Sequence, residues 1–139
     1  MQAQQSIMIH APIEVVWSTL TDIEQWPRWQ AAVSASLLQG QLEPSAEFFW
    51  KSGGMNIRSQ IQEIDAPSAI RWSGRALGTK ADHSWSLTSI GSDTQVTTNE
   101  SMSGWLVASI SLFNKNFLAN ALKQSLAGLK LESERLHAV

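Results

Sequence analysis

Apolar and polar residues alternate over the middle of this chain, and turn residues interrupt the alternation at short intervals. The pattern runs from about Val33 to Gly104 and predicts a meander of antiparallel strands. The interruptions fall at residues 40–45, 53–54, 65–68, 77–78 and 91–92, and each contains glycine or proline. Because the length of a turn fixes the register of the strands it joins, each interruption also predicts which residues lie side by side.

Four of these turns predict one consistent sheet face. They set Trp50 opposite Ile57, Phe48 opposite Ser59, Ile61 opposite Trp72, Ser59 opposite Gly74, Trp72 opposite His83, Ile70 opposite Trp85, and His83 opposite Glu100. Opposed residues point to the same side of a sheet, so one face collects Phe48, Trp50, Ile57, Ile61, Ile70, Trp72, Trp85, Leu87, Val96 and Met102. The other face is polar apart from Phe49. A slip of one residue would expose the apolar set, so the agreement supports all four registers.

Helical patterns flank the meander. A short strand at about Ser6 to His10 precedes a helix that begins at Pro12, and a second short helix follows, which Pro27 ends or distorts. From about Leu106 to His137 the apolar residues return to helical spacing, which predicts one long amphipathic helix. Only this helix is long enough to cover the apolar sheet face, so the expected fold is α+β, a curved antiparallel sheet gripping a C-terminal helix.

Composition narrows the classes of protein. With 139 residues, 43% of them apolar, the chain is expected to form a single domain over residues 1–139. A net charge of −2 without a basic cluster argues against nucleic acid as a partner. The chain has no cysteine and three scattered histidines, and it lacks nucleotide-binding and hydrolase motifs, so we expect no metal and no cofactor. Without a leader or a long apolar run, we expect a cytoplasmic protein with no stable membrane insertion.

The predicted inner face is unusually polar for a dry core. It carries Ser59, His83, Thr98 and Glu100 among the tryptophans, and such a mixture is typical of a pocket. His83 and Glu100 are predicted to be direct cross-strand neighbours, close enough for Glu100 to accept a hydrogen bond and hold the imidazole in one tautomer. Three interpretations stay open: the two residues anchor the sheet, they orient a ligand, or His83 is a catalytic acid or base positioned by Glu100.

Large apolar side chains provide candidates for the wall of such a pocket. Trp50, Trp72 and Trp85 offer flat apolar surfaces with one N–H group each, and they are equally suited to filling a core. Met102, Phe113 and Phe117 are candidates for the ligand-facing side of the pocket mouth and the last helix, with ordinary core packing as the alternative. Trp17, Trp26 and Trp29 are interpreted as structural residues that pack the short helices at the sheet rim.

Several segments, in this order, resemble the START-like or SRPBCC superfamily, and within it the small bacterial polyketide cyclase/dehydrase-like proteins. They are residues 11–17 (APIEVVW), 21–29 (TDIEQWPRW), 49–50 before Gly53 and Gly54, 70–74 (IRWSG), 83–85 (HSW), and the run from Glu100 to Gly104. The resemblance implies a helix-grip fold in which seven antiparallel strands wrap the C-terminal helix around an apolar cavity. It implies no shared catalytic residues, because members include lipid carriers, aromatase/cyclases, quinone-binding proteins and co-chaperone domains.

The leading hypothesis is a protein that binds a small hydrophobic molecule, such as a lipid, isoprenoid or polyketide-like compound, between the sheet and the C-terminal helix. Its expected ligand-binding residues are Trp50, Ser59, Trp72, His83, Trp85, Glu100, Met102, Phe113 and Phe117. The alternatives are a cyclase or dehydratase in which His83 is the acid/base and Glu100 orients it, and an interaction module without a cavity ligand, for which exposed Phe49 is the cue. The sequence leaves both a monomer and a homodimer open.

Overall fold

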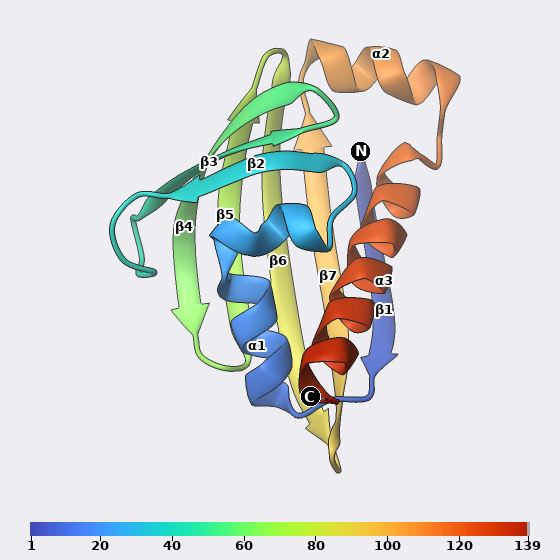
Figure 1. The fold of residues 1–139 in the computed structure, drawn as a ribbon. Coiled ribbons are helices and arrows are strands. Elements are labelled where there is room, and N and C mark those ends of the chain that lie inside the picture. The colour runs from blue at the N-terminus through green and yellow to red at the C-terminus, as the bar shows by residue number, and fades with distance from the viewer. Residues whose placement is uncertain (139) are drawn as a thin grey trace.

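A seven-stranded antiparallel sheet forms the frame of the molecule in the computed structural model, which describes residues 1–138 (Figure 1). The strand order is β1-β7-β6-β5-β4-β3-β2. The elements along the chain are β1 (Gln2–Ile9), α1 (Ile13–Thr21), the 3-10 helix η1 (Ile23–Arg28), β2 (Val33–Leu38), β3 (Glu47–Ser52), β4 (Met55–Asp65), β5 (Ala69–Ala76), β6 (Thr79–Ile90), β7 (Asp93–Ser103), α2 (Trp105–Phe113) and α3 (Phe117–His137). The α+β helix-grip architecture expected from the sequence is therefore confirmed.

The predicted strand registers are also confirmed. Every predicted pair across β3, β4, β5, β6 and β7 is present, including the row that joins Ile61, Trp72, His83 and Glu100 across four strands. The turn between β4 and β5 differs in detail, because Asp65 pairs with Ala69 and only three residues form the loop. A β-bulge between Ile61 and Glu63 takes up the extra residue and restores the predicted pairing.

Two predicted boundaries were wrong. The first strand begins at Gln2 rather than near Ser6, because pairing with β7 continues along the whole segment. The single C-terminal helix is divided into α2 and α3 by residues 114–116. In this break the main-chain N–H of Asn116 donates a hydrogen bond to the Asn114 side chain over 3.1 Å. Asparagine side chains compete for the main-chain groups that a helix needs, and this explains the interruption.

Trp26 of η1 fills the concave face of the sheet over β3 and β5. Its side chain is 1% exposed, and its ring centroid lies 5.4 Å from that of Phe48, 5.2 Å from Trp50 and 5.5 Å from Trp72. The indole N–H donates a hydrogen bond of 2.9 Å to the Leu20 carbonyl oxygen, so the polar atom is satisfied inside the core. The structural role expected for Trp26 is therefore larger than rim packing, because it covers the central aromatic residues.

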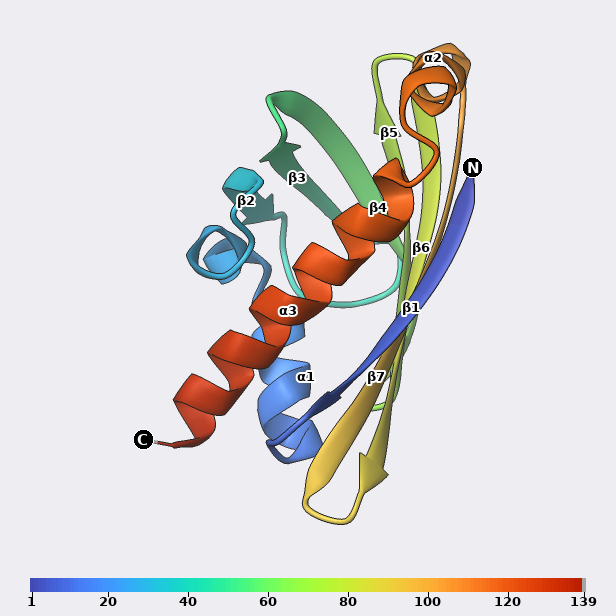
Figure 2. The ribbon, with the colours of Figure 1, turned by 90° about the vertical axis from the view of Figure 1, so that its right-hand side faces the viewer.

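Helix α3 covers the other half of the concave face. It packs on β1 and α1, and Figure 2 shows it crossing the sheet obliquely. Its buried stripe consists of Leu118, Leu122, Leu126 and Leu129. The C-terminal half is also fixed by polar contacts, since Lys130 donates hydrogen bonds to the Met8 carbonyl oxygen and to Glu134.

Gly128 allows α3 to approach the segment that follows η1. A methyl group on its α-carbon would overlap the carbonyl oxygen of Trp29. The packing of α3 against this part of the chain therefore depends on a residue without a side chain. Close to this contact, the buried Glu132 carboxylate lies 2.7 Å from Arg135 Nε and 3.7 Å from Arg28 Nε.

We predict that Gly128→Ala destabilises the protein by about 1–3 kcal/mol, because the added methyl group must push α3 away from Trp29. In an unobstructed helix the same change would stabilise by about 1 kcal/mol, so the sign of the effect is diagnostic. Urea denaturation measures the free energy of unfolding, and Gln124→Ala on the exposed side of α3 is the control. A more stable Gly128→Ala protein would contradict the proposed contact.

Candidate functional site

The candidate site lies on β6 and β7, where the predicted pair of His83 and Glu100 is found. The two residues are directly opposed, and His83 Nδ1 lies 3.7 Å from Glu100 Oε1. That separation is too long for a hydrogen bond, so the predicted direct bond from His83 to Glu100 is absent. The Glu100 side chain is 17% exposed and that of His83 is 9% exposed.

Thr98 fixes the tautomer of His83. Its hydroxyl donates a hydrogen bond of 3.0 Å to the Ser84 carbonyl oxygen, which uses its only proton. The contact of 2.7 Å between Thr98 Oγ1 and His83 Nε2 must therefore have the imidazole N–H as donor. This places the ring proton on Nε2 and leaves the Nδ1 lone pair on the side of Glu100. The tautomer is set by Thr98 and not, as the sequence suggested, by Glu100.

Sequence reasoning placed Thr98 on the inner face but did not include it in the site. Thr98 pairs directly with Trp85, which makes it a diagonal neighbour of His83. Diagonal neighbours in antiparallel sheets are within reach of larger side chains, so the predicted register contained the signal. The sequence did not indicate which group accepts the hydrogen bond of the Thr98 hydroxyl.

Burial makes both ionisable groups favour their neutral forms. It lowers the pKa of His83 from 6.5 to about 3, and it raises the pKa of Glu100 from 4.5 to about 7. Near neutral pH the imidazole is therefore uncharged, and the carboxyl group is divided between its acid and its carboxylate. A neutral Nδ1 acceptor and a carboxylic acid donor lie side by side in an apolar interior.

The tryptophans predicted to line a wall form a continuous aromatic cluster with His83. The His83 ring stacks on Trp85 with centroids 5.1 Å apart, and its other neighbour is Trp72 at 5.2 Å. The Trp85 indole N–H is buried and has no hydrogen-bond partner among residues 1–138. Trp50 donates its indole N–H to Ser59 Oγ over 3.0 Å, so the Ser59 hydroxyl is already engaged.

A row of small residues lies next to this cluster, on the side towards α2. Ala81, Gly74 and Ser59 are cross-strand neighbours on β6, β5 and β4, and Met102 pairs with Ala81 at the end of the row. We call these four residues the shelf. Three of its residues, Ala81, Gly74 and Ser59, have small side chains, so the sheet itself contributes little bulk along this row.

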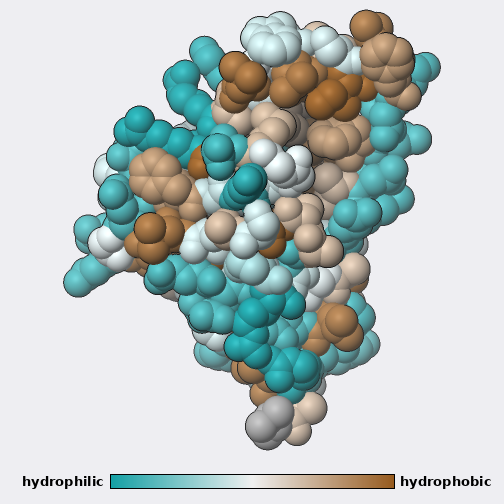
Figure 3. Space-filling view, turned by 45° about the horizontal axis from the view of Figure 1, so that its top comes forward, coloured by the Kyte–Doolittle hydropathy of each residue, from teal (hydrophilic) through white to brown (hydrophobic). Residues whose placement is uncertain are grey.

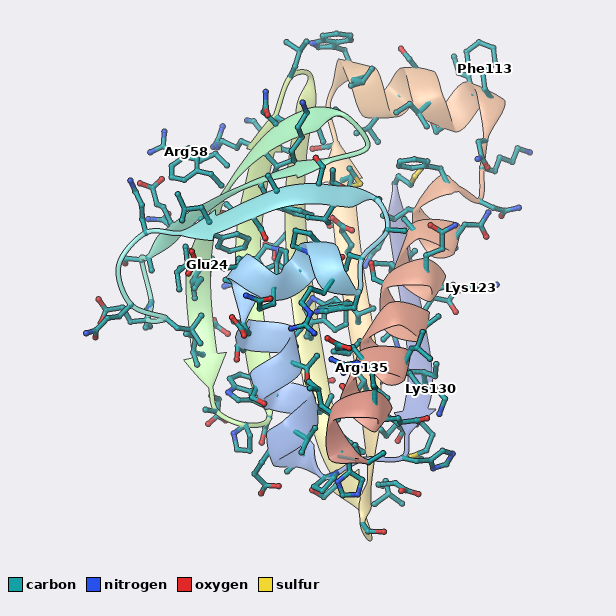
Figure 4. All side chains as sticks on the ribbon, in the orientation of Figure 1. Glu24, Arg58, Phe113, Lys123, Lys130 and Arg135 are labelled. Atoms are coloured by element: carbon teal, nitrogen blue, oxygen red, sulfur yellow. The ribbon has the colours of Figure 1, made fainter. Side chains whose placement is uncertain are left out.

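The remaining predicted site residues are divided between the interior and the surface. Met102 is half-buried on the shelf, and Phe117 at the start of α3 is 36% exposed. Phe113 is 91% exposed at the end of α2 and does not line the interior, because the break after it turns the expected helix stripe away from the sheet (Figure 4). Phe49 is exposed, as expected.

Two open hollows lie on the sheet. One of about 430 Å³ is at the α2 end of β1, β6 and β7, and its lining includes Ala81 and Met102 of the shelf. The other, of about 530 Å³, is lined by residues that include Leu37, Phe49, Arg58 and Arg75. Neither is lined by His83 or Glu100. Over residues 1–138 no group of three or more histidine or acidic side chains is arranged to hold a metal ion.

We predict that Glu100→Gln changes the pH dependence of stability. Because the pKa of Glu100 is raised in the folded protein, the contribution of this group to the free energy of unfolding is fully present below about pH 4.5 and is lost as the pH rises through 7. The free energy of unfolding of the variant should therefore increase relative to that of wild type by on the order of 2–3 kcal/mol between pH 4.5 and pH 8. Urea denaturation at both pH values measures this difference. The effect of the lowered pKa of His83 on the free energy of unfolding is common to both proteins and cancels.

Glu63→Gln is the control for this prediction, because Glu63 lies exposed on the outer face of the same sheet. Its stability should follow that of wild type from pH 4.5 to pH 8. An equal stability difference for Glu100→Gln at the two pH values would show that the carboxyl group does not titrate abnormally.

Solved structures with the same fold come from several bacteria. A hypothetical protein from Helicobacter pylori matches with a TM-score of 0.84 and 18% identity, over 96% of this chain and 88% of that one. A START superfamily protein from Mycobacterium smegmatis has a TM-score of 0.82 and 14% identity, over 97% and 98% of the two chains. The ZhuI aromatase/cyclase from Streptomyces sp. R1128 has a TM-score of 0.84 and 13% identity, over 97% and 94%. At these identities the likeness concerns the fold alone.

The sequence itself identifies the family. No curated protein matches this chain. A family model described as "Polyketide cyclase / dehydrase and lipid transport" matches residues 1–134, which is nearly the whole chain. The protein therefore belongs to the polyketide cyclase/dehydrase and lipid transport family.

Proposed function

We propose that this protein binds a small hydrophobic molecule on the shelf, with a polar group of the ligand held by Glu100 and His83. The observation that carries the proposal is the buried pair itself. A carboxyl group and an imidazole nitrogen face an apolar interior, and no hydrogen bond joins them. Such groups are costly to bury without partners, and a ligand that bonds to them supplies what the fold leaves out.

The shape of the interior limits where the ligand can lie. Trp26 already covers Phe48 and Trp72, so we place the ligand beside the aromatic cluster and not over it. The shelf is free of large side chains in its centre, and the half-buried Trp50 and Ile57 stand at its β3–β4 end. A lipid, isoprenoid or polyketide-like compound would bury its apolar part there.

The protonation states indicate which polar group the ligand carries. Protonated Glu100 is a hydrogen-bond donor, and so is the unpaired Trp85 indole N–H. A carbonyl oxygen accepts from such donors without bringing a charge into the interior. A carbonyl compound is therefore preferred to a carboxylate, which would also repel Glu100 in its ionised form.

The test uses the naphthyl ketone Prodan, a small apolar fluorophore with a carbonyl acceptor. We predict saturable binding that weakens about tenfold from pH 6 to pH 8, because Glu100 loses its donor proton as the pH passes its pKa of about 7. Fluorescence titration measures the Kd. Glu100→Gln keeps an N–H donor at every pH, so its affinity should be nearly independent of pH.

Two further variants locate the site. Ala81→Phe should abolish binding by filling the centre of the shelf, whereas Glu63→Gln should bind as wild type does, with the same pH dependence. Native mass spectrometry of the freshly purified protein, followed by denaturation, would identify a ligand that is retained through purification. Absence of saturable Prodan binding at pH 6, together with a clean apo mass, would refute the proposal.

A second function, cyclisation with loss of water, is favoured by the unbonded Nδ1 of His83. With its proton on Nε2, the imidazole can take a proton from a carbon next to a carbonyl, and protonated Glu100 can donate one to the carbonyl that is attacked. A new C–C bond then forms, and water leaves to give an enone. The ZhuI aromatase/cyclase, which shares the fold, supports this alternative by analogy only.

The enzyme alternative predicts that the protein converts 2,6-heptanedione to its cyclic enone and that His83→Ala abolishes turnover. Prodan binding at pH 6 should persist in this variant, because Glu100 still supplies the donor. Absorbance of the enone measures the rate, and His10→Ala, which removes an exposed histidine, is the control. Equal rates for wild type and His83→Ala would exclude His83 as the base.

A further inference from the structure

Helix α2 exposes an apolar surface that the proposed ligand site does not use. Its nine residues, WLVASISLF, include no charged side chain, and Val107 is the only one that is fully buried. Trp105, Leu112 and Phe113 are exposed by 63%, 82% and 91%. Helices that are apolar on all sides usually lie in a protein core or in contact with a membrane.

The exposed residues of α2 lie on one side of the helix. At 100° per residue, Trp105, Ala108, Ser109, Leu112 and Phe113 form a continuous arc, and all are exposed. Leu106, Val107, Ile110 and Ser111 form the opposite arc and are buried or half-buried. The helix therefore has a true outward face. Figure 3 shows hydrophobic residues gathered at this end of the molecule.

Helix α2 is held at the end of the sheet by contacts with the turn between β5 and β6. The main-chain N–H of Leu106 donates a hydrogen bond of 3.1 Å to the Gly78 carbonyl oxygen in the turn between β5 and β6. A methyl group on Gly104 would overlap the same oxygen, so the approach requires glycine. Leu77, in the same turn, is 76% exposed. We call Leu77, Trp105, Leu112 and Phe113 the α2 patch.

The charges around the α2 patch are of one sign. Antiparallel pairing brings the β3–β4 turn, the β5–β6 turn and α2 to the same end of the sheet (Figure 1). Residues 51–57, 75–81 and 101–123 contain no aspartate or glutamate, whereas they contain Lys51, Arg75, Lys80, Lys115 and Lys123, all exposed. The exposed acid nearest in sequence is Asp82, which lies 3.1 Å from Arg71 and shares this guanidinium with Glu63.

We propose that the α2 patch docks on an anionic lipid surface. Trp105, Leu112 and Phe113 would enter the interfacial region of the bilayer, and the surrounding cations would contact lipid phosphates. Charge complementarity decides for this partner over a second copy of the chain. Two copies paired through this end would bring their lysines and arginines together, whereas an anionic bilayer attracts them.

A separate finding concerns the length of the helices. Over residues 1–138, none of them is both long enough and apolar enough to cross a bilayer.

Co-sedimentation with lipid vesicles tests the proposal. Wild type should bind vesicles of phosphatidylcholine with about 30% phosphatidylglycerol and bind pure phosphatidylcholine vesicles much more weakly. The double variant Leu112→Ser with Phe113→Ser should lose more than tenfold in affinity for the anionic vesicles, because two exposed apolar side chains no longer enter the bilayer. Lys80→Glu with Lys115→Glu should lose binding to anionic vesicles specifically.

The matched control is Leu131→Ser on α3, which removes an exposed leucine of similar exposure, 75%, that is not part of the α2 patch. It should bind anionic vesicles as wild type does. Prodan binding at pH 6 should be unchanged in the α2 double variant, which separates this proposal from the ligand site and verifies folding. The proposal would be overturned if wild type does not co-sediment with anionic vesicles, or if the α2 double variant binds them as wild type does. A change from dimer to monomer in that variant would assign the α2 patch to self-association instead.

Discussion

The packing of Trp26 against Phe48, Trp50 and Trp72 determines how the rest of the concave face is used. A curved sheet must cover its apolar side, and here two elements share the task. Trp26 from η1 covers β3 and β5, while α3 packs on β1. His83 and Glu100, on β6 and β7, lie between these two covers. The pair is buried there, yet His83 Nδ1 and Glu100 Oε1 lie 3.7 Å apart and share no hydrogen bond.

The strand pairing could be predicted because alternation and turn length are local properties. A slip of one residue would have exposed Trp72 or Trp85, so the sequence leaves little freedom in register. The extra residue of the β4–β5 bulge was not visible, because a longer turn and a shorter turn with a bulge give the same pairing at Ile61 and Trp72. The break in the C-terminal helix was missed because the apolar spacing continues through residues 114–116, and only the asparagines oppose it.

The candidate site could be predicted to the level of neighbours but not of bonds. Register placed His83 beside Glu100, yet the 3.7 Å separation depends on side-chain torsions that no pattern encodes. Thr98 Oγ1 accepts a hydrogen bond from the Nε2–H group of His83 because its own hydroxyl proton is donated to the Ser84 carbonyl oxygen. The role of Trp26 was underestimated for a similar reason. A short distorted helix at the rim gives no sign, in sequence, of how deeply one of its side chains enters the sheet.

The proposed ligand site and the proposed membrane surface are joined by β7. Glu100 precedes Gly104 by four residues, and a strand rises about 3.3 Å per residue, so their α-carbons lie roughly 13 Å apart, with α2 beginning at the next residue. The shelf lies between them, with Met102 at its end. For a hydrophobic ligand the large free-energy cost is exposure to water. A site whose open end faces a bilayer avoids that exposure, because the ligand passes from lipid to the shelf without leaving an apolar environment. The positions of the small residues and of the exposed α2 side chains, at the same end of the sheet, are then parts of one arrangement.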